Sequence, residues 1–359
     1  MKKIVYIGKY NGIIGGIERY MQKSAELLRR NGFSVHYLYM ADGGKDQAAF
    51  ADAFDSVEQF SPENPLPQSA DMVIIHNIIP PEHLSALPEN KTCFFAHDHN
   101  IYCRRHHYYT PLGRRNCHRK YQALRCFFCS LGRNEAPPLE AYRKLPALVL
   151  SEFMADNLRK NGFKKVVKLP AFIKAVEKER TFMPDGVLRI LFLGQLIRGK
   201  GADLMLDSLT FLTEPFECTI AGEGKDRAML EKQVREAALN VKFTGFVSNP
   251  ETLWDNCDIL FFPSRWQEPF GLVGLEAMAH GVPVIAFDTG GVREWLSHLE
   301  NGIIVPEKAD VTAAGMLGGL AQNPRALAMM GKRGLELAKE KFSEETFVEN
   351  FKKLPEELE

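Results

Sequence analysis

The stretch that decides the fold is residues 263–284, which read PSRWQEPFGLVGLEAMAHGVPV. One short apolar run, Ile259 to Phe262, precedes it and another begins at Pro283, so two buried strands are expected on its flanks. Between them we predict a loop and then a helix that begins near Gly271. The first backbone N–H groups of such a helix and the positive end of its dipole favour phosphate.

Two glutamates of the same stretch stand eight residues apart. Glu268 precedes the predicted helix, and Glu276 lies about a turn and a half inside it. One carboxylate can therefore reach the mouth of a site while the other hydrogen-bonds hydroxyls deeper in it. An isolated pair of this kind is more often a capped helix with a solvated second glutamate, because charged residues usually face water. The flanking sequence decides between the two interpretations.

Strands and helices alternate on both sides of this stretch. In the first half, short apolar or β-branched runs lie at 3–7, 35–40, 72–76, 93–96 and 147–150. In the second half, they lie at 188–193, 218–221, 241–243, 259–262, 283–287 and 303–305. Amphipathic segments separate these runs, which predicts βαβ units and parallel sheets covered by helices on both faces.

The chain is long enough for two domains. It has 359 residues, 45% hydrophobic and 25% charged, which is an ordinary globular composition. Residues 173–186 are charged and lack an apolar period, so we place the linker there. We expect a first domain over 1–174, a second over 175–340, and a C-terminal helix over 341–359 that crosses back to the first. The amphipathic pattern over 325–354 predicts helical structure, long enough to finish the second domain and cross back to the first.

Charge is divided unevenly between the halves. The formal net charge is zero, yet residues 1–174 carry 25 Lys and Arg against 16 Asp and Glu, a net charge of +9. This asymmetry predicts that the first domain faces an anionic partner, although scattered solvated charge would give the same count. No apolar run reaches the ~18–20 residues of a bilayer span. Seven cysteines are typical of a reducing compartment, so we expect a cytoplasmic protein that associates with anionic membrane through its basic first domain.

An irregular segment over 100–138 interrupts the alternation of the first half. Its basic residues are Arg104, Arg105, Arg114, Arg115, Arg119, Lys120 and Arg125. Its aromatic residues include Tyr102, Tyr108, Tyr109, Tyr121, Phe127 and Phe128. This composition suits an anionic lipid surface or a lipid-diphosphate acceptor, and it also suits single-stranded nucleic acid. A merely solvated loop is the third interpretation.

The same segment holds four cysteines with the spacing C-x13-C-x8-C-x2-C, namely Cys103, Cys117, Cys126 and Cys129. A C-x2-C pair can bind one Zn²⁺, and two more thiolates would complete a tetrahedral structural site. Such an ion would give shape to a loop without a core of its own. Four reduced thiols packed as small apolar side chains are an equal alternative, and the inferred compartment disfavours disulfides.

The stretch 263–284 resembles the E-x7-E signature of the GT4 retaining glycosyltransferases, which have the GT-B fold. Other matching stretches occur in the family's order at 15–18, 194–201, 221–224, 245–247, 263–264 and 290–291. The resemblance implies an α/β chain of two Rossmann-like, doubly wound parallel-sheet domains facing a central cleft. It also implies a hexosyltransferase-type enzyme that uses a nucleotide-diphosphate sugar.

The resemblance gives each matching residue of the second half a role. Glu268 would contact hydroxyls of the transferred sugar, and Glu276 would hold the ribose hydroxyls. The diphosphate would bind the backbone amides of Phe270, Gly271, Leu272 and Val273. The base would lie against Gly245, Phe246 and Val247.

Lys200 matches the basic residue of the family's G-R-L-x-x-x-K-G pattern, which neutralises the leaving diphosphate. Here residues 194–201 read GQLIRGKG, so Gln195 replaces the usual Arg and removes a bidentate phosphate partner. We expect Arg198, three residues on, to supply the missing charge. The departure leaves open whether the donor is typical of the family.

In the first half the resemblance implicates Gly15 and Gly16, at a strand-to-helix turn where the lack of a Cβ lets backbone amides approach the donor. A plain pair of turn glycines is the alternative. It also places His97, at the end of a strand, beside the donor sugar, with Asp98 and His99 as weaker candidates. A buried structural histidine is an equal alternative for His97.

The implied reaction is glycosyl transfer with retention. We see no nucleophile with an adjacent base, so we expect a front-face displacement in which the leaving phosphate takes the acceptor proton. No D-x-D pair stands near the donor motif, and we expect no catalytic metal. We favour a UDP-sugar donor over GDP-sugar, and a lipid-linked or cell-surface polysaccharide or lipopolysaccharide acceptor.

Two other classes of protein would account for part of this sequence. A nucleic-acid-binding protein with a zinc module would explain the segment 100–138 but leaves Glu268 and Glu276 unused, so we expect no nucleic-acid partner. A dinucleotide oxidoreductase would need G-x-G-x-x-G after the first strand, and the glycines from Gly8 to Gly16 do not have this spacing.

Overall fold

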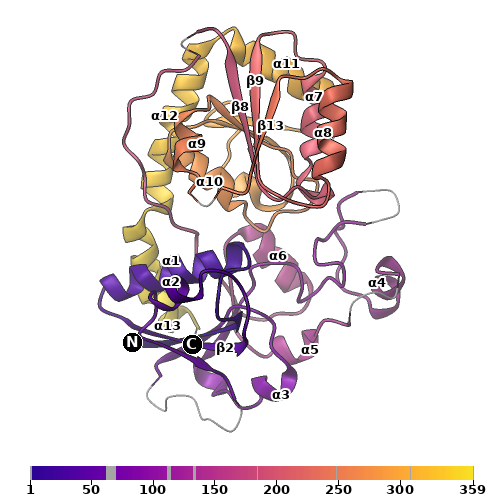
Figure 1. Cartoon of the computed structure of the whole chain (residues 1–359). Helices are drawn as coiled ribbons and strands as arrows, with labels where there is room; N and C mark the ends of the chain where they lie inside the picture. The colour runs from indigo at the N-terminus through magenta and orange to yellow at the C-terminus, as the bar shows by residue number, and fades with distance from the viewer. Residues whose placement is uncertain are drawn as a thin grey trace. The chain divides into compact units, whose positions relative to one another are not determined.

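The computed structural model describes residues 2–61, 70–110, 115–131, 135–183, 185–247, 249–307 and 309–358 (Figure 1). The chain divides into two compact units, Met1–Pro170 with Glu344–Glu359, and Ala171–Ser343. Each unit contains one parallel β-sheet with helices around it.

The sheet of the first unit has seven strands in the order β3-β2-β1-β4-β5-β6-β7. Its strands are β1 (Lys3–Tyr10), β2 (Ser34–Ala41), β3 (Ser56–Gln59), β4 (Met72–Ile75), β5 (Thr92–Phe95), β6 (Ala147–Val149) and β7 (Val166–Lys168). Every neighbouring pair is parallel. The order reverses at β1, and crevices for ligands form at the carboxyl ends of strands on such a switch point.

The helices of the first unit follow the strands. They are α1 (Gly16–Arg30), α2 (Gln47–Ala51), α3 (Pro81–Leu84), α4 (Ala123–Cys129), α5 (Leu139–Tyr142), α6 (Glu152–Lys160) and α13 (Glu344–Leu358), with the 3₁₀ turn η1 (Glu89–Lys91). On α1, Met21, Ala25 and Leu28 recur on one face and are fully buried.

The second unit has six parallel strands in the order β10-β9-β8-β11-β12-β13. They are β8 (Leu188–Leu193), β9 (Phe216–Ala221), β10 (Val241–Gly245), β11 (Ile259–Phe262), β12 (Val284–Phe287) and β13 (Gly302–Val305). The helices are η2 (Arg198–Lys200), α7 (Ala202–Leu209), α8 (Arg227–Glu236), α9 (Glu251–Asp255), α10 (Leu272–Ala279), η3 (Gly290–Glu294), α11 (Asp310–Ala321) and α12 (Pro324–Phe342). Here the order reverses at β8. Both units are therefore doubly wound, which confirms the predicted α/β class.

The segment 325–354 is helical, as its amphipathic pattern predicts, but it forms two helices. Helix α12 ends at Phe342 and α13 begins at Glu344, because Ser343 between them is extended (φ −69°, ψ 158°). Serine favours a helix start, and Glu344 and Glu345 suit the positive end of a new helix. The C-terminal helix therefore begins at Glu344 rather than at 341, and it belongs to the first unit.

Candidate active site

Two loops interlock at the carboxyl edge of the second sheet, where β8 and β11 are neighbours. The backbone N–H of Arg265 donates to the Gly199 carbonyl at 2.9 Å. A Cβ on Gly199 would lie 1.8 Å from the Trp266 ring, and one on Gly201 would lie 1.9 Å from the Pro263 carbonyl. These glycines let the loop after β8 lie directly against the loop after β11.

This contact brings Lys200 and Glu268 together. Lys200 Nζ lies 2.7 Å from Glu268 Oε1, and the Ser264 hydroxyl donates to the same oxygen at 2.5 Å. The Glu268 side chain is buried, with 9% of its surface exposed, whereas that of Lys200 is 30% exposed. A buried carboxylate with a movable cation beside it is an arrangement that a bound anion can rearrange.

A second ion pair fixes the same loop. The Arg265 guanidinium donates to both carboxylate oxygens of Asp203, in the first turn of α7, and to the Arg198 carbonyl at 2.9 Å. Its side chain is 7% exposed. We did not predict this pair from the sequence, because its members are 62 residues apart.

Helix α10 begins at the position expected from the sequence. Gly271 is its N-cap with φ +95°, a conformation that favours glycine. The Phe270 ring is buried, and its carbonyl accepts a 2.7 Å hydrogen bond from Trp295 Nε1. Phe270 can therefore serve a ligand only through its backbone. Leu272 and Val273 form the first turn, whose N–H groups have no partner within a helix.

Glu276 lies one turn further along α10 and is half-buried. Phe342 packs against Phe270 with 5.8 Å between ring centroids, so this end of the helix rests on α12. Gly274 lies under Trp295, since a Cβ there would be 2.1 Å from the indole ring. The helix start is thus held rigidly from behind.

The remaining predicted residues of the second unit lie on loops at the same edge. Gln195 and Arg198, after β8, are exposed. Gly245 ends β10 with φ +75°, and its carbonyl accepts from Gly222 N at 2.8 Å. Phe246 is 60% exposed and Val247 is half-buried.

In the first unit, Gly15 and Gly16 form the start of α1. Gly15 is the N-cap, and its backbone N–H donates to Glu18 Oε2 at 2.9 Å. A Cβ on either glycine would meet nothing within 4 Å. Packing within the unit therefore does not require glycine at these two positions.

His97 follows β5 at the carboxyl edge of the first sheet. Its Nε2 lies 2.8 Å from Nδ1 of His76, which follows β4, and its ring stacks on Phe95 at 4.2 Å between centroids. Burial lowers the pKa of His97 to about 3, and it also lowers the pKa of His76. Both imidazoles are therefore neutral at pH 7. The sequence pattern puts His76 at the end of a strand and gives no sign of a role for it.

Asp98 and His99 shape the loop that follows. Asp98 accepts hydrogen bonds from the backbone and side-chain nitrogens of Asn100 at 2.9 and 2.7 Å, while burial raises its pKa to about 6. His99 is buried and hydrogen-bonds the Tyr102 hydroxyl. These hydrogen bonds are local, but the His99 ring also packs edge-on against Phe153 of α6, with 6.0 Å between ring centroids.

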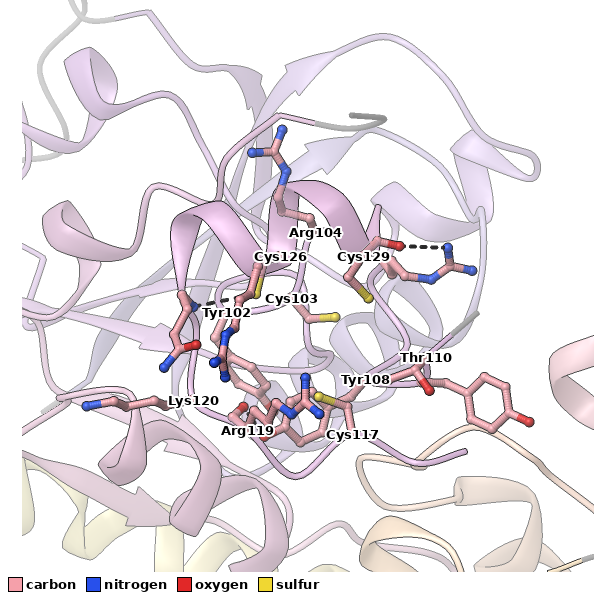
Figure 2. A pocket seen from close by; sticks show the side chains of 14 residues that line it. Tyr102, Cys103, Arg104, Tyr108, Thr110, Cys117, Arg119, Lys120, Cys126 and Cys129 are labelled. Atoms are coloured by element: carbon pink, nitrogen blue, oxygen red, sulfur yellow. Dashed lines mark hydrogen bonds between the residues drawn. The ribbon is translucent and has the colours of Figure 1, made fainter. Parts of the chain in front are cut away.

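The four cysteines of the segment 100–138 line a single cavity (Figure 2). All four are free thiols. Within this segment the structure adds helix α4 and an isolated bridge between Tyr109 and Asn116. Arg114 lies outside the described residues.

Comparison with known proteins shows what these features resemble. Residues 174–336 match the model of the family described as Glycosyl transferases group 1. This part of the chain, most of the second unit, is therefore similar to the glycosyltransferases of that group. The chain's two doubly wound parallel sheets are the GT-B fold, and the match supports the glycosyltransferase interpretation rather than the nucleic-acid one.

Two curated relatives and one solved structure illustrate the similarity. D-inositol 3-phosphate glycosyltransferase of Jonesia denitrificans is 34% identical over 148 residues, 37% of this chain and 34% of that protein. The uncharacterized glycosyltransferase MJ1178 of Methanocaldococcus jannaschii is 31% identical over 214 residues, 59% of each. The chain thus spans less than two thirds of either relative. Anabaena Alr3699/HepE, solved with UDP and glucose, matches 100% of both chains with a TM-score of 0.75 at 15% identity.

Proposed function

We propose that the protein transfers a sugar from a UDP-sugar to a lipid-linked or cell-surface polysaccharide or lipopolysaccharide acceptor, with retention of anomeric configuration. The observation that carries this proposal is the contact of Lys200 with Glu268 at the carboxyl edge of the second sheet. The start of α10 lies in the same polypeptide segment, three residues after Glu268. A cation, a helix N-terminus and a buried carboxylate are the groups that a sugar diphosphate needs.

The ion pair has a role in this proposal. When the donor binds, its diphosphate takes the Lys200 ammonium and the first N–H groups of α10. Glu268 then retains the Ser264 hydroxyl and gains hydroxyls of the donor sugar as partners. Exchanging one partner for another in this way keeps the buried carboxylate satisfied throughout.

The chemical step follows from the same groups. The acceptor oxygen attacks the anomeric carbon on the face from which the diphosphate leaves, and the bond from this carbon to the phosphate oxygen breaks. The electron pair goes to the diphosphate, which also takes the proton of the acceptor hydroxyl. Lys200 and the amides of α10 stabilise the charge that develops. Neutral His97 would contribute a hydrogen bond rather than a charge.

UDP is the proposed nucleotide because Anabaena Alr3699/HepE, which shares this fold, has been solved in complex with it. Glu276 would hold the ribose, since an ionised carboxylate can accept hydrogen bonds from two vicinal hydroxyls. Gly245 to Val247 would lie along the base.

The acceptor and the membrane would meet the segment 100–138. Leu124, Phe128 and Leu131 are 71%, 65% and 66% exposed. Arg115 is exposed as well. Apolar side chains among cations suit the headgroup region of an anionic bilayer. Among the described helices, none combines the length and the hydropathy needed to cross a bilayer.

A thermal-shift and hydrolysis panel of UDP-, GDP- and ADP-sugars tests the donor, because ligand binding raises the apparent stability. We expect the response to be largest with a UDP-sugar. Glu276→Ala should weaken binding of both UDP and uridine about 10- to 100-fold, the range of a lost hydrogen bond to a charged group. Glu236→Ala, an exposed glutamate on α8, is the matched control. Unchanged UDP affinity in Glu276→Ala would remove the ribose role.

Charge reversal tests the acceptor side. Arg115→Glu should impair transfer to acceptor more than hydrolysis of the donor, because it alters only the acceptor or membrane contact. Arg114→Glu, outside the described residues, should add to the effect. Lys164→Glu places the same reversal at another exposed site of the unit. Equal loss of transfer and hydrolysis in Arg115→Glu would argue against this role.

A further inference from the structure

Helix α4 is weakly attached to the first unit. None of its seven residues is buried. The Arg105 guanidinium donates to the Cys129 carbonyl at 3.4 Å, and Arg104 lies over the Phe127 ring at 5.3 Å. Contacts of this kind contribute little, and a helix this short is not stable alone. In Figure 1, α4 lies apart from the other labelled helices of its unit.

Four cysteines from three segments surround one cavity beside this helix. Cys126 and Cys129 lie on α4 at i and i+3, which places them on one face. Cys103 lies on the loop after β5, and Cys117 follows the bridge at Asn116. All four side chains line the same cavity. Figure 2 shows the sulfur atoms around the same hollow.

The cavity has the chemistry of a thiolate–metal site. Its volume is about 50 Å³, and its described lining includes no Asp or Glu. Its basic lining residues are Arg104, Arg105, Arg119, Lys120 and Arg125. Zn²⁺ bound by four thiolates is dianionic, so a positive rim suits it. Backbone N–H groups also reach the sulfurs: that of Gln122 lies 3.5 Å from Cys126 Sγ, and those of Arg105 and Tyr108 hydrogen-bond Cys103.

The sulfur atoms line the cavity rather than meet at one point. Among the described residues, no group of three or more His, Cys, Asp or Glu side chains is arranged to hold a metal ion. Four Zn–S bonds of about 2.3 Å require the thiols to draw inward. Rotation of the loop residues Cys103 and Cys117, and a small movement of the lightly packed α4, would achieve this.

We propose that Cys103, Cys117, Cys126 and Cys129 bind one structural Zn²⁺ ion, which fastens α4 to the loop after β5. Four thiolates complete the tetrahedron and leave no position for water or substrate, so the ion is structural rather than catalytic. It replaces the hydrophobic core that the helix lacks, and it fixes the exposed apolar and basic side chains of the segment in one arrangement. The proposal does not depend on the identity of the donor or acceptor.

Metal analysis of the full chain, purified under reducing conditions, is the direct test. We expect about one zinc per chain, removable by a strong chelator and restored by Zn²⁺ alone. Co²⁺ added to the metal-free protein should give the intense thiolate-to-metal absorption of a tetrahedral site. Hydrogen exchange across 115–131 should slow when the metal is restored. No bound zinc together with no cobalt–thiolate absorption in the reduced wild-type protein would overturn the proposal, whether or not any variant folds.

Substitutions identify the ligands. Cys126→Ser with Cys129→Ser should abolish zinc binding and the cobalt absorption. Cys93→Ala, a buried thiol on β5 of the same unit, should leave both unchanged. Zinc retained at the wild-type level in the double variant would show that these thiols are not ligands and would also overturn the proposal.

Discussion

The carboxyl edges of the two sheets use glycine differently. At the edge of the second sheet, a Cβ on Gly199, Gly201 or Gly222 would lie within 2 Å of an atom of a neighbouring loop. At the edge of the first sheet, a Cβ on Gly15 or Gly16 would meet nothing within 4 Å. Packing within the second unit explains Gly199, Gly201 and Gly222. Packing within the first unit does not explain Gly15 or Gly16, so these two glycines are the better indicator of a ligand.

The largest effect is expected from Gly222→Ala. Its Cβ would lie 1.8 Å from the Gly194 carbonyl oxygen, and its φ is +144°. Since the loops after β8 and β9 cannot separate without losing hydrogen bonds, we expect a loss of about 4 kcal/mol or more in the free energy of unfolding. Denaturant unfolding measures it. Gly315→Ala on α11, where a Cβ meets nothing, is the control and should be neutral or stabilising. Equal stability of the two variants would contradict the packing explanation.

Lys200→Ala should lower kcat about 10²- to 10³-fold, the usual result of removing one group that stabilises developing charge. It should also lower the free energy of unfolding, because it leaves the buried Glu268 carboxylate without its cation, but by less than Gly222→Ala since Ser264 still donates to it. Steady-state kinetics with the preferred donor measures this, with Lys232→Ala on α8 as the exposed-lysine control. A Lys200→Ala enzyme with wild-type kcat would contradict the proposal that Lys200 stabilises the charge on the leaving diphosphate.

The buried imidazoles of the first edge give a pH dependence. Between its native pKa of about 3 and the ordinary value of 6.5, His97 binds fewer protons in the native state than in the unfolded one. The free energy of unfolding therefore falls as the pH falls through this window, by up to about 2 kcal/mol at pH 5. The raised pKa of Asp98 acts in the opposite direction below about pH 6 and offsets part of it.

His97→Gln removes this contribution, so the variant should lose less stability than the wild type between pH 7 and pH 5. Urea unfolding at the two pH values measures the difference. If the wild type and His97→Gln lose the same free energy of unfolding between pH 7 and pH 5, His97 is exposed to solvent rather than buried at the edge of the sheet.

The smallest effect is expected from Gly15→Ala. Its extended φ of −163° is accessible to any residue, so stability should change by less than about 0.5 kcal/mol. If backbone amides at this turn approach the donor, the added methyl should raise KM for the donor about tenfold, which corresponds to 1.4 kcal/mol. An unchanged KM for the donor would show that Gly15 is an ordinary turn glycine. The glycines at the edge of the first sheet would then not indicate a ligand.

The sequence predicts the buried strands well because they are continuous apolar runs. It misses β3 and β7, the edge strands of the first sheet, because Ser56–Gln59 and Val166–Lys168 are only partly buried and have no long apolar run. The helix start at Gly271 was predictable, since a glycine followed by an apolar helical pattern is a local signal.

What the sequence cannot show is which distant residues meet. The pair of Lys200 with Glu268 joins residues 68 apart, and His76 and His97 follow two different strands. Each partner alone is an ordinary polar residue near a strand end. Only the sheet order, which brings β8 beside β11 and β4 beside β5, makes them neighbours.

Calorimetric titration of the wild type and Lys200→Ala with UDP and with uridine tests the central claim most directly, that the second edge holds the donor diphosphate. The account predicts that the wild type binds UDP more tightly than uridine, and that Lys200→Ala loses most of this difference without a change in uridine affinity. A wild type that does not bind UDP, or a variant that keeps the full preference for UDP, would contradict it.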